Sequence, residues 1–243
     1  MFPTGGFSSN PDPNRWGAPN EIERAACVSL ITRIEDMLHA PELACVFQPG
    51  KTQTVFKEIE AFLNDDAIRV LRISLKYLPF AHNAREIVAN AVGRHVLDLA
   101  RKARFASRPL VLVLDEAHHF LNRNVADENT INPMDSFELI AKEGRKMALS
   151  FCIATQRPRD IPEGILSQIG TFVVHRLNNE HDRSAVENAS ADADRTVMAF
   201  IPGLSEGQGV IIGADLPLPL VVQVNKPDQQ PDSRGPNYQK NWR

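Results

Sequence analysis

The feature that most constrains the fold is an unbroken apolar run, P-L-V-L-V-L at 109–114, that ends in two adjacent carboxylates, Asp115 and Glu116. A run of this length, rich in Val and Leu, is typical of a strand in a parallel sheet that is buried on both faces. In open α/β sheets, ligands bind beyond the carboxyl ends of such strands. Because two dehydrated carboxylates are costly without a partner, the run predicts a fully buried parallel strand with a charged site at its end.

The partner that best suits two acids at this position is a magnesium ion carried by a nucleotide. Mg²⁺ binds through one or two carboxylates, waters and substrate phosphates, and a second acid is then free to act on water. On this interpretation 109–116 is a Walker B element, in which Asp115 holds a water on Mg²⁺ and Glu116 polarises the attacking water. The alternative is a strand end followed by a solvated acidic turn.

A second apolar run, L-S-F-C-I-A-T at 149–155, is followed by Gln156, and Pro158 stops its direct continuation. If the two strands are neighbours, Gln156 lies near Asp115 and Glu116 at the same edge of the sheet. A neutral amide there can donate to a γ-phosphate and accept from an attacking water. We therefore expect Gln156 to sense whether the nucleotide is intact, the alternative being a polar turn that only ends the strand.

Four short motifs follow one another along the chain: V-L-D-E-A-H-H-F-L at 113–121, A-K-E-G-R-K at 141–146, A-T-Q-R-P at 154–158 and I-L-S-Q-I at 165–169. Together they resemble the HerA branch of the HerA/FtsK superfamily, from about Ala67 to about Val224, with 207–213 and 218–222 resembling its closing strands. The resemblance implies a RecA-like P-loop NTPase fold, with a mostly parallel sheet flanked by helices. It also implies an ATPase and helicase that uses ATP and Mg²⁺ to translocate on double-stranded DNA as a hexameric ring.

The E-G-R-K motif gives a further expectation. It implies that Arg145 is an arginine finger that reaches the nucleotide of the neighbouring subunit, although Arg157 and Arg176 also sit near sheet edges and could take its place. The alternative for Arg145 is a surface salt bridge. The resemblance also implies a partner protein, a nuclease or a defence or secretion component, whose identity these residues do not give.

The chain departs from the family where a phosphate loop, G-x-x-x-x-G-K-[S/T], is needed to surround the phosphates with backbone N–H groups and a lysine. The candidate is C-V-F-Q-P-G-K-T at 45–52, in which Cys45 replaces the first glycine and Pro49 removes an N–H donor. We therefore expect a turn at Gly50 and Lys51 between a strand near 43–47 and a following helix. The chain resembles the C-terminal half of a HerA-type protein, with an incomplete core that lacks the Walker A loop.

Two other functions compete with this prediction. A non-catalytic ring-assembly module could offer Arg145 to a neighbour, and bind a partner protein or DNA, without hydrolysing ATP itself. The literal Asp115-Glu-Ala-His118 resembles motif II of DEAH-box helicases, but the Q-x-x-G-R-x-G-R motif that those enzymes need is absent from 171–243. His118 and His119 lack H-E-x-x-H spacing, so we expect them to pack and form hydrogen bonds rather than bind a metal.

The composition of the chain limits the kinds of function and location that we expect. The net charge of −3 argues against a general electrostatic grip on nucleic acid, and no apolar stretch is long enough to span a membrane. The three cysteines, Cys27, Cys45 and Cys152, are predicted to be buried free thiols in a reducing cytosol, so a cytoplasmic protein is expected.

The predicted organisation is a flexible linker at 1–20, the C-terminal part of a RecA-like ATPase domain at 21–226 with a helical subregion at 21–66, and a flexible or neighbour-docked tail at 227–243. Within it we expect helices at about 21–39, 53–63, 83–103, 134–147, 161–169 and 180–189. Strands are expected at about 43–47, 68–75, 109–114, 149–155 and 171–175, in addition to the two closing strands.

Overall fold

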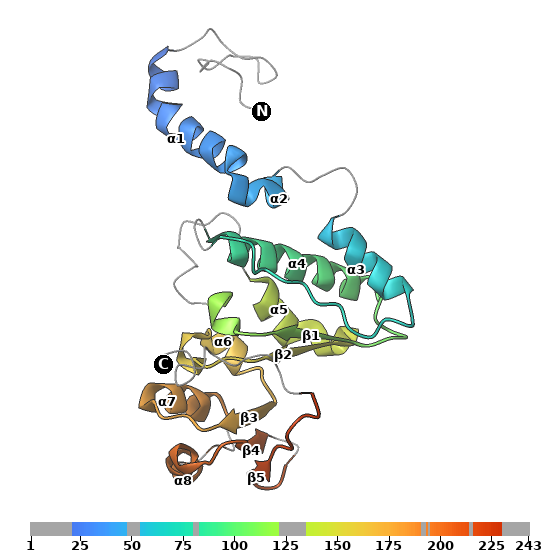
Figure 1. The fold of residues 1–243 in the computed structure, drawn as a ribbon, viewed down its shortest axis with the longest axis vertical. Coiled ribbons are helices and arrows are strands. Elements are labelled where there is room, and N and C mark those ends of the chain that lie inside the picture. Colours follow the sequence, from blue (N-terminus) through green and yellow to red (C-terminus); the bar gives the residue numbers. More distant parts are fainter. Residues whose placement is uncertain are drawn as a thin grey trace, which may run out of the picture. The chain divides into compact units, whose positions relative to one another are not determined.

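The computed structural model describes residues 21–47, 54–79, 83–121, 135–190, 193, 195–213 and 216–229 (Figure 1). The chain divides into two compact units, Met1–Val88 and Ala89–Arg243. The predicted linker at 1–20, residues 122–134 and most of the predicted tail lie outside the described residues. So does the predicted turn at Gly50 and Lys51. No helix of the described part is long and apolar enough to cross a membrane.

The first unit is helical over most of its described length. It contains α1 (Glu21–His39), a short 3₁₀ turn (Pro41–Leu43), α2 (Ala44–Phe47) and α3 (Val55–Asn64), and Thr54 caps α3 by accepting a hydrogen bond from the Lys57 amide at 3.3 Å. The predicted strand at 43–47 is therefore wrong. A short apolar run fits a helical turn as well as a strand, and Pro41 is favourable in the first turn of a helix.

Residues 68–75 belong to no strand of the structure, so this second prediction is also wrong. The apolar side chains that suggested a strand are exposed, Val70 to 80%. A strand needs ladder hydrogen bonds and a buried face, and an apolar pattern indicates only the second of these. The predicted helix at 83–103 is confirmed as α4 (Ala84–Arg101), which crosses the boundary between the two units.

The second unit contains the two strands that carry the predicted site. β1 (Leu110–Leu114) pairs in parallel with β2 (Leu149–Ile153), so that Leu110 lies opposite Leu149. Helix α5 (Ser136–Glu143) and a 3₁₀ turn (Gly144–Met147) lead into β2, and Phe137 of α5 stacks on Phe151 with ring centroids 5.9 Å apart. The predicted α/β fold, with parallel strands flanked by helices, is confirmed.

One face of this sheet is packed and the other is open. Alternate side chains of β1 and β2 point to opposite faces, and Phe151 lies on the face that α5 covers. On the other face Val111 and Val113 are 58% and 59% exposed, and Cys152 is also exposed. The prediction of a fully buried strand is therefore wrong, because α5 covers only one side.

The prediction that all three cysteines are buried is also wrong. Cys27 and Cys152 are free and exposed rather than buried, while the side chain of Cys45 lies outside the described residues.

A second sheet is antiparallel, in the order β3–β4–β5, and is formed by β3 (Thr171–His175), β4 (Gln208–Gly213) and β5 (Leu220–Gln223) (Figure 1). The chain from β2 to β4 also contains α6 (Glu163–Leu166), α7 (Glu180–Ala189) and α8 (Arg195–Phe200), with 3₁₀ turns at Pro158–Asp160 and Ile201–Gly203. The alternation of strands and helices does not predict this pairing. The link between β4 and β5 is too short for a parallel crossover, which needs about a dozen residues or more.

Candidate nucleotide-hydrolysis site

The predicted site residues lie where β1 and β2 end side by side. The backbone pairing continues past both strands, because the Ala154 amide donates to the Leu114 carbonyl and the Ala117 amide donates to the Ala154 carbonyl, each at 2.9 Å. The two apolar strands are therefore neighbours, which is the condition under which Gln156 is expected to lie near Asp115 and Glu116. This edge is the carboxyl end of a parallel pair, where α/β sheets bind ligands.

Glu116 occupies a bend with an unusual backbone. Its φ of 49° and ψ of 47° lie in the left-handed region, directly before the 3₁₀ turn Ala117–His119, and its amide donates to the Asp115 carboxylate at 3.1 Å. A non-glycine residue in a sparsely populated conformation costs about 1–3 kcal/mol, and such residues cluster at functional sites. The strain is consistent with a chain that must turn sharply here to hold Glu116 at the sheet edge.

Gln156 and Glu116 are in direct contact across the strand ends. The Gln156 amide Nε2 donates to Glu116 Oε1 at 2.7 Å, and the Glu116 side chain is 40% exposed. A carboxylate is only an acceptor, so the amide must present its N–H₂ group here and leaves its carbonyl oxygen available. The two groups that the sequence assigns to water activation and nucleotide sensing therefore meet, and their roles in catalysis remain predictions.

Asp115 is exposed at the end of β1, beside Glu116. Carboxylate oxygens are the ligands that Mg²⁺ prefers, and Mg²⁺ on a nucleotide usually keeps several waters and takes only one or two protein carboxylates. The described residues contain no cluster of three or more His, Cys, Asp or Glu side chains that could hold a metal. The two adjacent carboxylates of Asp115 and Glu116 fit a Mg²⁺ ion that is carried by phosphates.

The phosphate-binding half of such a site is the part that the described residues do not supply. Cys45, which stands where the motif requires its first glycine, lies in α2, and residues 48–53 lie outside the described part. The sequence contains no complete G-x-x-x-x-G-K-[S/T] elsewhere. The described site thus offers carboxylates and an amide, without the nest of backbone N–H groups that a phosphate needs.

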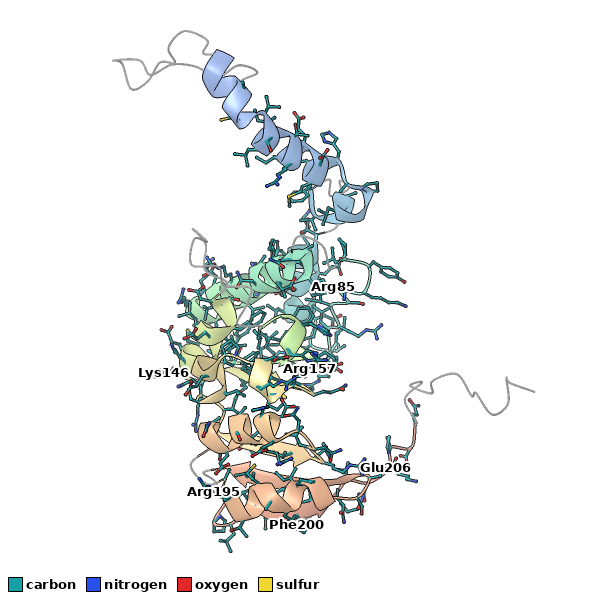
Figure 2. The ribbon with its side chains drawn as sticks, turned by 90° about the vertical axis from the view of Figure 1, so that its left-hand side faces the viewer. Arg85, Lys146, Arg157, Arg195, Phe200 and Glu206 are labelled. Atoms are coloured by element: carbon teal, nitrogen blue, oxygen red, sulfur yellow. The ribbon has the colours of Figure 1, made fainter. Side chains whose placement is uncertain are left out.

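Arg145 lies at the other end of β2 from this site. It is exposed in the 3₁₀ turn that precedes Leu149, whereas Gln156 follows Ile153, so the length of the strand, about 17 Å at ~3.3 Å per residue, separates them. Figure 2 labels the neighbouring Lys146, which precedes β2, and Arg157, which follows it. Arg145 therefore cannot reach the site of its own chain, which is compatible with action on another subunit.

The two alternative arginines lie closer to their sheet edges. Arg157 follows Gln156 and forms an ion pair with Asp160 at 3.8 Å, while its side chain stays 60% exposed. Arg176 is exposed directly after β3. The structure thus puts Arg157 beside the carboxylates of its own chain, and Arg145 away from them.

His118 is a site residue that the sequence pattern does not assign to catalysis. Its side chain is only 12% exposed, and its Nδ1 lies 3.2 Å from Thr155 Oγ1 and 3.4 Å from Glu116 Oε2. Burial lowers the pKa of His118 below 6.5, assisted by His119 and Arg157 and opposed by Glu116 and Asp160. The expected packing and hydrogen-bonding role is found, but its partner Thr155 is 37 residues away, which the local sequence does not indicate.

Comparison with known proteins gives partial matches. The chain is 34% identical over 116 residues to the DNA double-strand break repair helicase HerA of Pyrococcus furiosus, covering 48% of this chain and 20% of that protein. It is 25% identical over 233 residues to the protein of the same name from Sulfurisphaera tokodaii, covering 92% of this chain and 43% of that protein. No family model matches the chain.

The predicted resemblance to HerA-type ATPases is confirmed over part of the chain. The chain spans between 20% and 43% of the length of the curated HerA relatives and helicases that it matches. Among solved structures, the genome packaging NTPase B204 of Sulfolobus turreted icosahedral virus 2, in complex with AMPPCP, aligns with a TM-score of 0.44 and 12% identity. That alignment covers 57% of this chain and 63% of the viral protein.

Proposed function

We propose that this chain is the C-terminal portion of a HerA-like, ATP-dependent translocase that acts on double-stranded DNA. It contributes the Walker B carboxylates, a sensor glutamine and a trans-acting arginine to a hexameric ring. The observation that carries the proposal is the contact of 2.7 Å between Gln156 Nε2 and Glu116 Oε1 at the carboxyl edge of a parallel strand pair. The similarity to HerA helicases supports it.

In this proposal each side chain has one task. MgATP, when bound, supplies the γ-phosphoryl group and the charge that neutralises it. Asp115 would hold the Mg²⁺ ion through a water molecule, and Glu116 would accept a hydrogen bond from the attacking water. Gln156 exchanges its contact with Glu116 for one with the γ-phosphate. This exchange needs little movement, because Gln156 and Glu116 lie at the same edge of the sheet. Phosphoryl transfer needs positioning and charge stabilisation, and these groups can supply both.

The test is MgATP hydrolysis by the chain, with and without double-stranded DNA, for the wild type and for Glu116→Gln. The substitution keeps the size of the side chain and the contact partners but removes the acceptor charge, so it should retain MgATP binding and abolish turnover. The chain is tested alone and again with an added polypeptide that carries a phosphate loop. Unchanged turnover in Glu116→Gln would remove Glu116 from the mechanism.

Arg145 needs a test that separates the two subunits of an active site. In mixed assemblies, Arg145→Ala should block hydrolysis at the site of the neighbour while leaving Glu116 intact, so a mixture with Glu116→Gln protein should recover activity. Arginine fingers contribute about 10³–10⁵ in rate. Arg157→Ala, which changes an exposed arginine at the other end of β2, is the matched comparison. If Arg157→Ala alone reproduces the loss, the finger has been assigned to the wrong residue.

A non-catalytic ring-assembly module is the second candidate, since no complete phosphate-loop motif is found in the sequence and Arg145 is exposed away from the carboxylates. Such a module would assemble and stimulate a nucleotide-binding neighbour without hydrolysing ATP. Native mass spectrometry with and without MgATP distinguishes the cases: a stable monomer that ignores nucleotide would contradict both. A nuclease or a defence or secretion protein is the proposed class of partner.

A further inference from the structure

The Glu116 carboxylate lies between two side chains that come from different directions. Gln156 Nε2 donates to Oε1 at 2.7 Å, and His118 Nδ1 lies 3.4 Å from Oε2. Oε2 itself is buried and has no hydrogen-bond partner within the described part of the chain. A buried carboxylate oxygen without a donor is unusual in native structures and calls for an explanation.

The His118 ring can supply the donor in only one of its two neutral forms. With the proton on Nδ1, the ring nitrogen can donate to Thr155 Oγ1 at 3.2 Å, and Glu116 Oε2 lies 3.4 Å from the same nitrogen. With the proton on Nε2, a ring lone pair faces the carboxylate oxygen, and two acceptors would repel each other. The arrangement therefore favours the Nδ1–H form, as the form of a histidine is set by its hydrogen-bond partners.

Thr155 completes the arrangement from the other strand. Its hydroxyl oxygen accepts from the Arg157 amide at 3.0 Å, which fixes the turn after β2, and it also faces His118 Nδ1. Two contacts thus tie the end of β1 to the end of β2, one from Gln156 to Glu116 and one from His118 to Thr155. Gln156 and His118 also lie near different oxygens of the Glu116 carboxylate, Gln156 near Oε1 and His118 near Oε2.

We propose that His118 is a positioning residue that carries its proton on Nδ1 and, together with Thr155, holds the Glu116 carboxylate in its orientation for water activation. The inference rests on the proposed function, in which Glu116 acts on water. Gln156 must leave Glu116 when it turns to a phosphate, whereas the side chain of His118 is only 12% exposed and need not move. The contact of His118 with the Glu116 carboxylate is therefore the one that is kept while the nucleotide is bound.

The charges around His118 agree with this role. Burial, His119 and Arg157 lower its pKa, against the opposing effects of Glu116 and Asp160, so the ring is neutral near pH 7. A neutral N–H group orients a carboxylate without cancelling its charge, whereas an imidazolium would form an ion pair and make Glu116 a weaker acceptor.

The first test does not depend on ATP turnover. Ring-nitrogen chemical shifts of His118 in the isotopically labelled chain, assigned with a His118→Asn variant, report which nitrogen carries the proton. We expect the Nδ1–H form, and a shift of that signal in Glu116→Gln, where the facing oxygen changes. A Nε2–H form, or a signal that Glu116→Gln does not move, would overturn the proposal.

The second test is kinetic and uses the assembly that hydrolyses MgATP. His118→Ala should lower kcat by roughly 10- to 100-fold with KM unchanged, because misplacing a catalytic group slows the chemical step without weakening substrate binding. His118→Asn should recover most of the loss, since its amide can donate from near the Nδ1 position. His175→Asn is the matched control: His175 Nδ1 also contacts an oxygen, the Gln208 carbonyl at 2.8 Å, but on β3.

The outcomes separate the two proposals. If Glu116→Gln abolishes turnover while His118→Ala retains the wild-type kcat, the positioning role is wrong and the proposed function stands. If Glu116→Gln leaves turnover unchanged, the proposed function fails, and the positioning role for water activation fails with it. The nitrogen shifts then still report whether His118 faces Glu116. Should His118→Ala not fold, the wild-type shifts and the His118→Asn kinetics decide the question.

Discussion

The two sheets of the second unit differ in what they bury and in what they present at their ends. The antiparallel sheet β3–β4–β5 packs its central strand tightly, with Val210 and Ile212 at most 1% exposed. The parallel pair β1–β2 leaves one face open, with Val111 58% exposed, and ends in Glu116 and Gln156. Val173 and Val221 of the antiparallel sheet are exposed as well, to 55% and 54%, so the two sheets differ in how tightly a central strand is packed and in the polar groups at their ends.

The largest expected effect comes from the centre of the antiparallel sheet. Ile212→Ala removes a fully buried side chain opposite Phe172 and should lower the free energy of unfolding by about 2–5 kcal/mol. Val111→Ala, on the exposed face of β1, should change it by no more than about 0.5 kcal/mol. Urea denaturation of both variants measures the difference. Equal losses would contradict the comparison and would mean that the open face is covered in solution.

A smaller loss is expected where α5 passes into β2. Gly144 is buried, and a Cβ atom there would lie 2.6 Å from the backbone oxygen of Leu149, so Gly144→Ala forces the backbone to shift and should cost about 1–3 kcal/mol. Gly203 has open space around its Cβ position, and Gly203→Ala should be neutral within about 0.5 kcal/mol. Thermal unfolding compares the two. If Gly144→Ala left the stability unchanged, the backbone at the entry into β2 would adapt to the added methyl group, and the close approach of Gly144 to Leu149 would not matter for stability.

The comparison also shows what the sequence can predict. Apolar runs locate β1, β2 and β3, and β3 matches its prediction at both ends. The same signal fails at 43–47 and 68–75, because short apolar runs do not distinguish a strand from a helical turn and do not reveal whether ladder partners exist. It also overstates the burial of β1, since a sequence of alternating Val and Leu cannot tell how many faces the rest of the fold covers.

The sequence likewise predicts some features of the site and not others. Polar residues directly after two buried strands predict that Glu116 and Gln156 meet, because parallel strands end at one edge. The left-handed backbone of Glu116 and the contact of His118 with Thr155 are not predictable locally. Both depend on the exact stagger between β1 and β2, which no single segment encodes.

The smallest expected effect is an acid sensitivity that arises at the site edge. The pKa of His118 is lowered below 6.5 in the folded chain, chiefly by burial, so on acidification the unfolded chain takes up this proton first. His118 therefore stabilises the fold fully only above about pH 6.5, and this contribution is lost as the pH falls toward the lowered pKa. Denaturation of wild type and His118→Asn between about pH 8 and pH 5 should show a shallower acid loss in the variant. A steeper loss in the variant would mean that Glu116 and Asp160 outweigh burial, so that His118 is held charged at the strand ends.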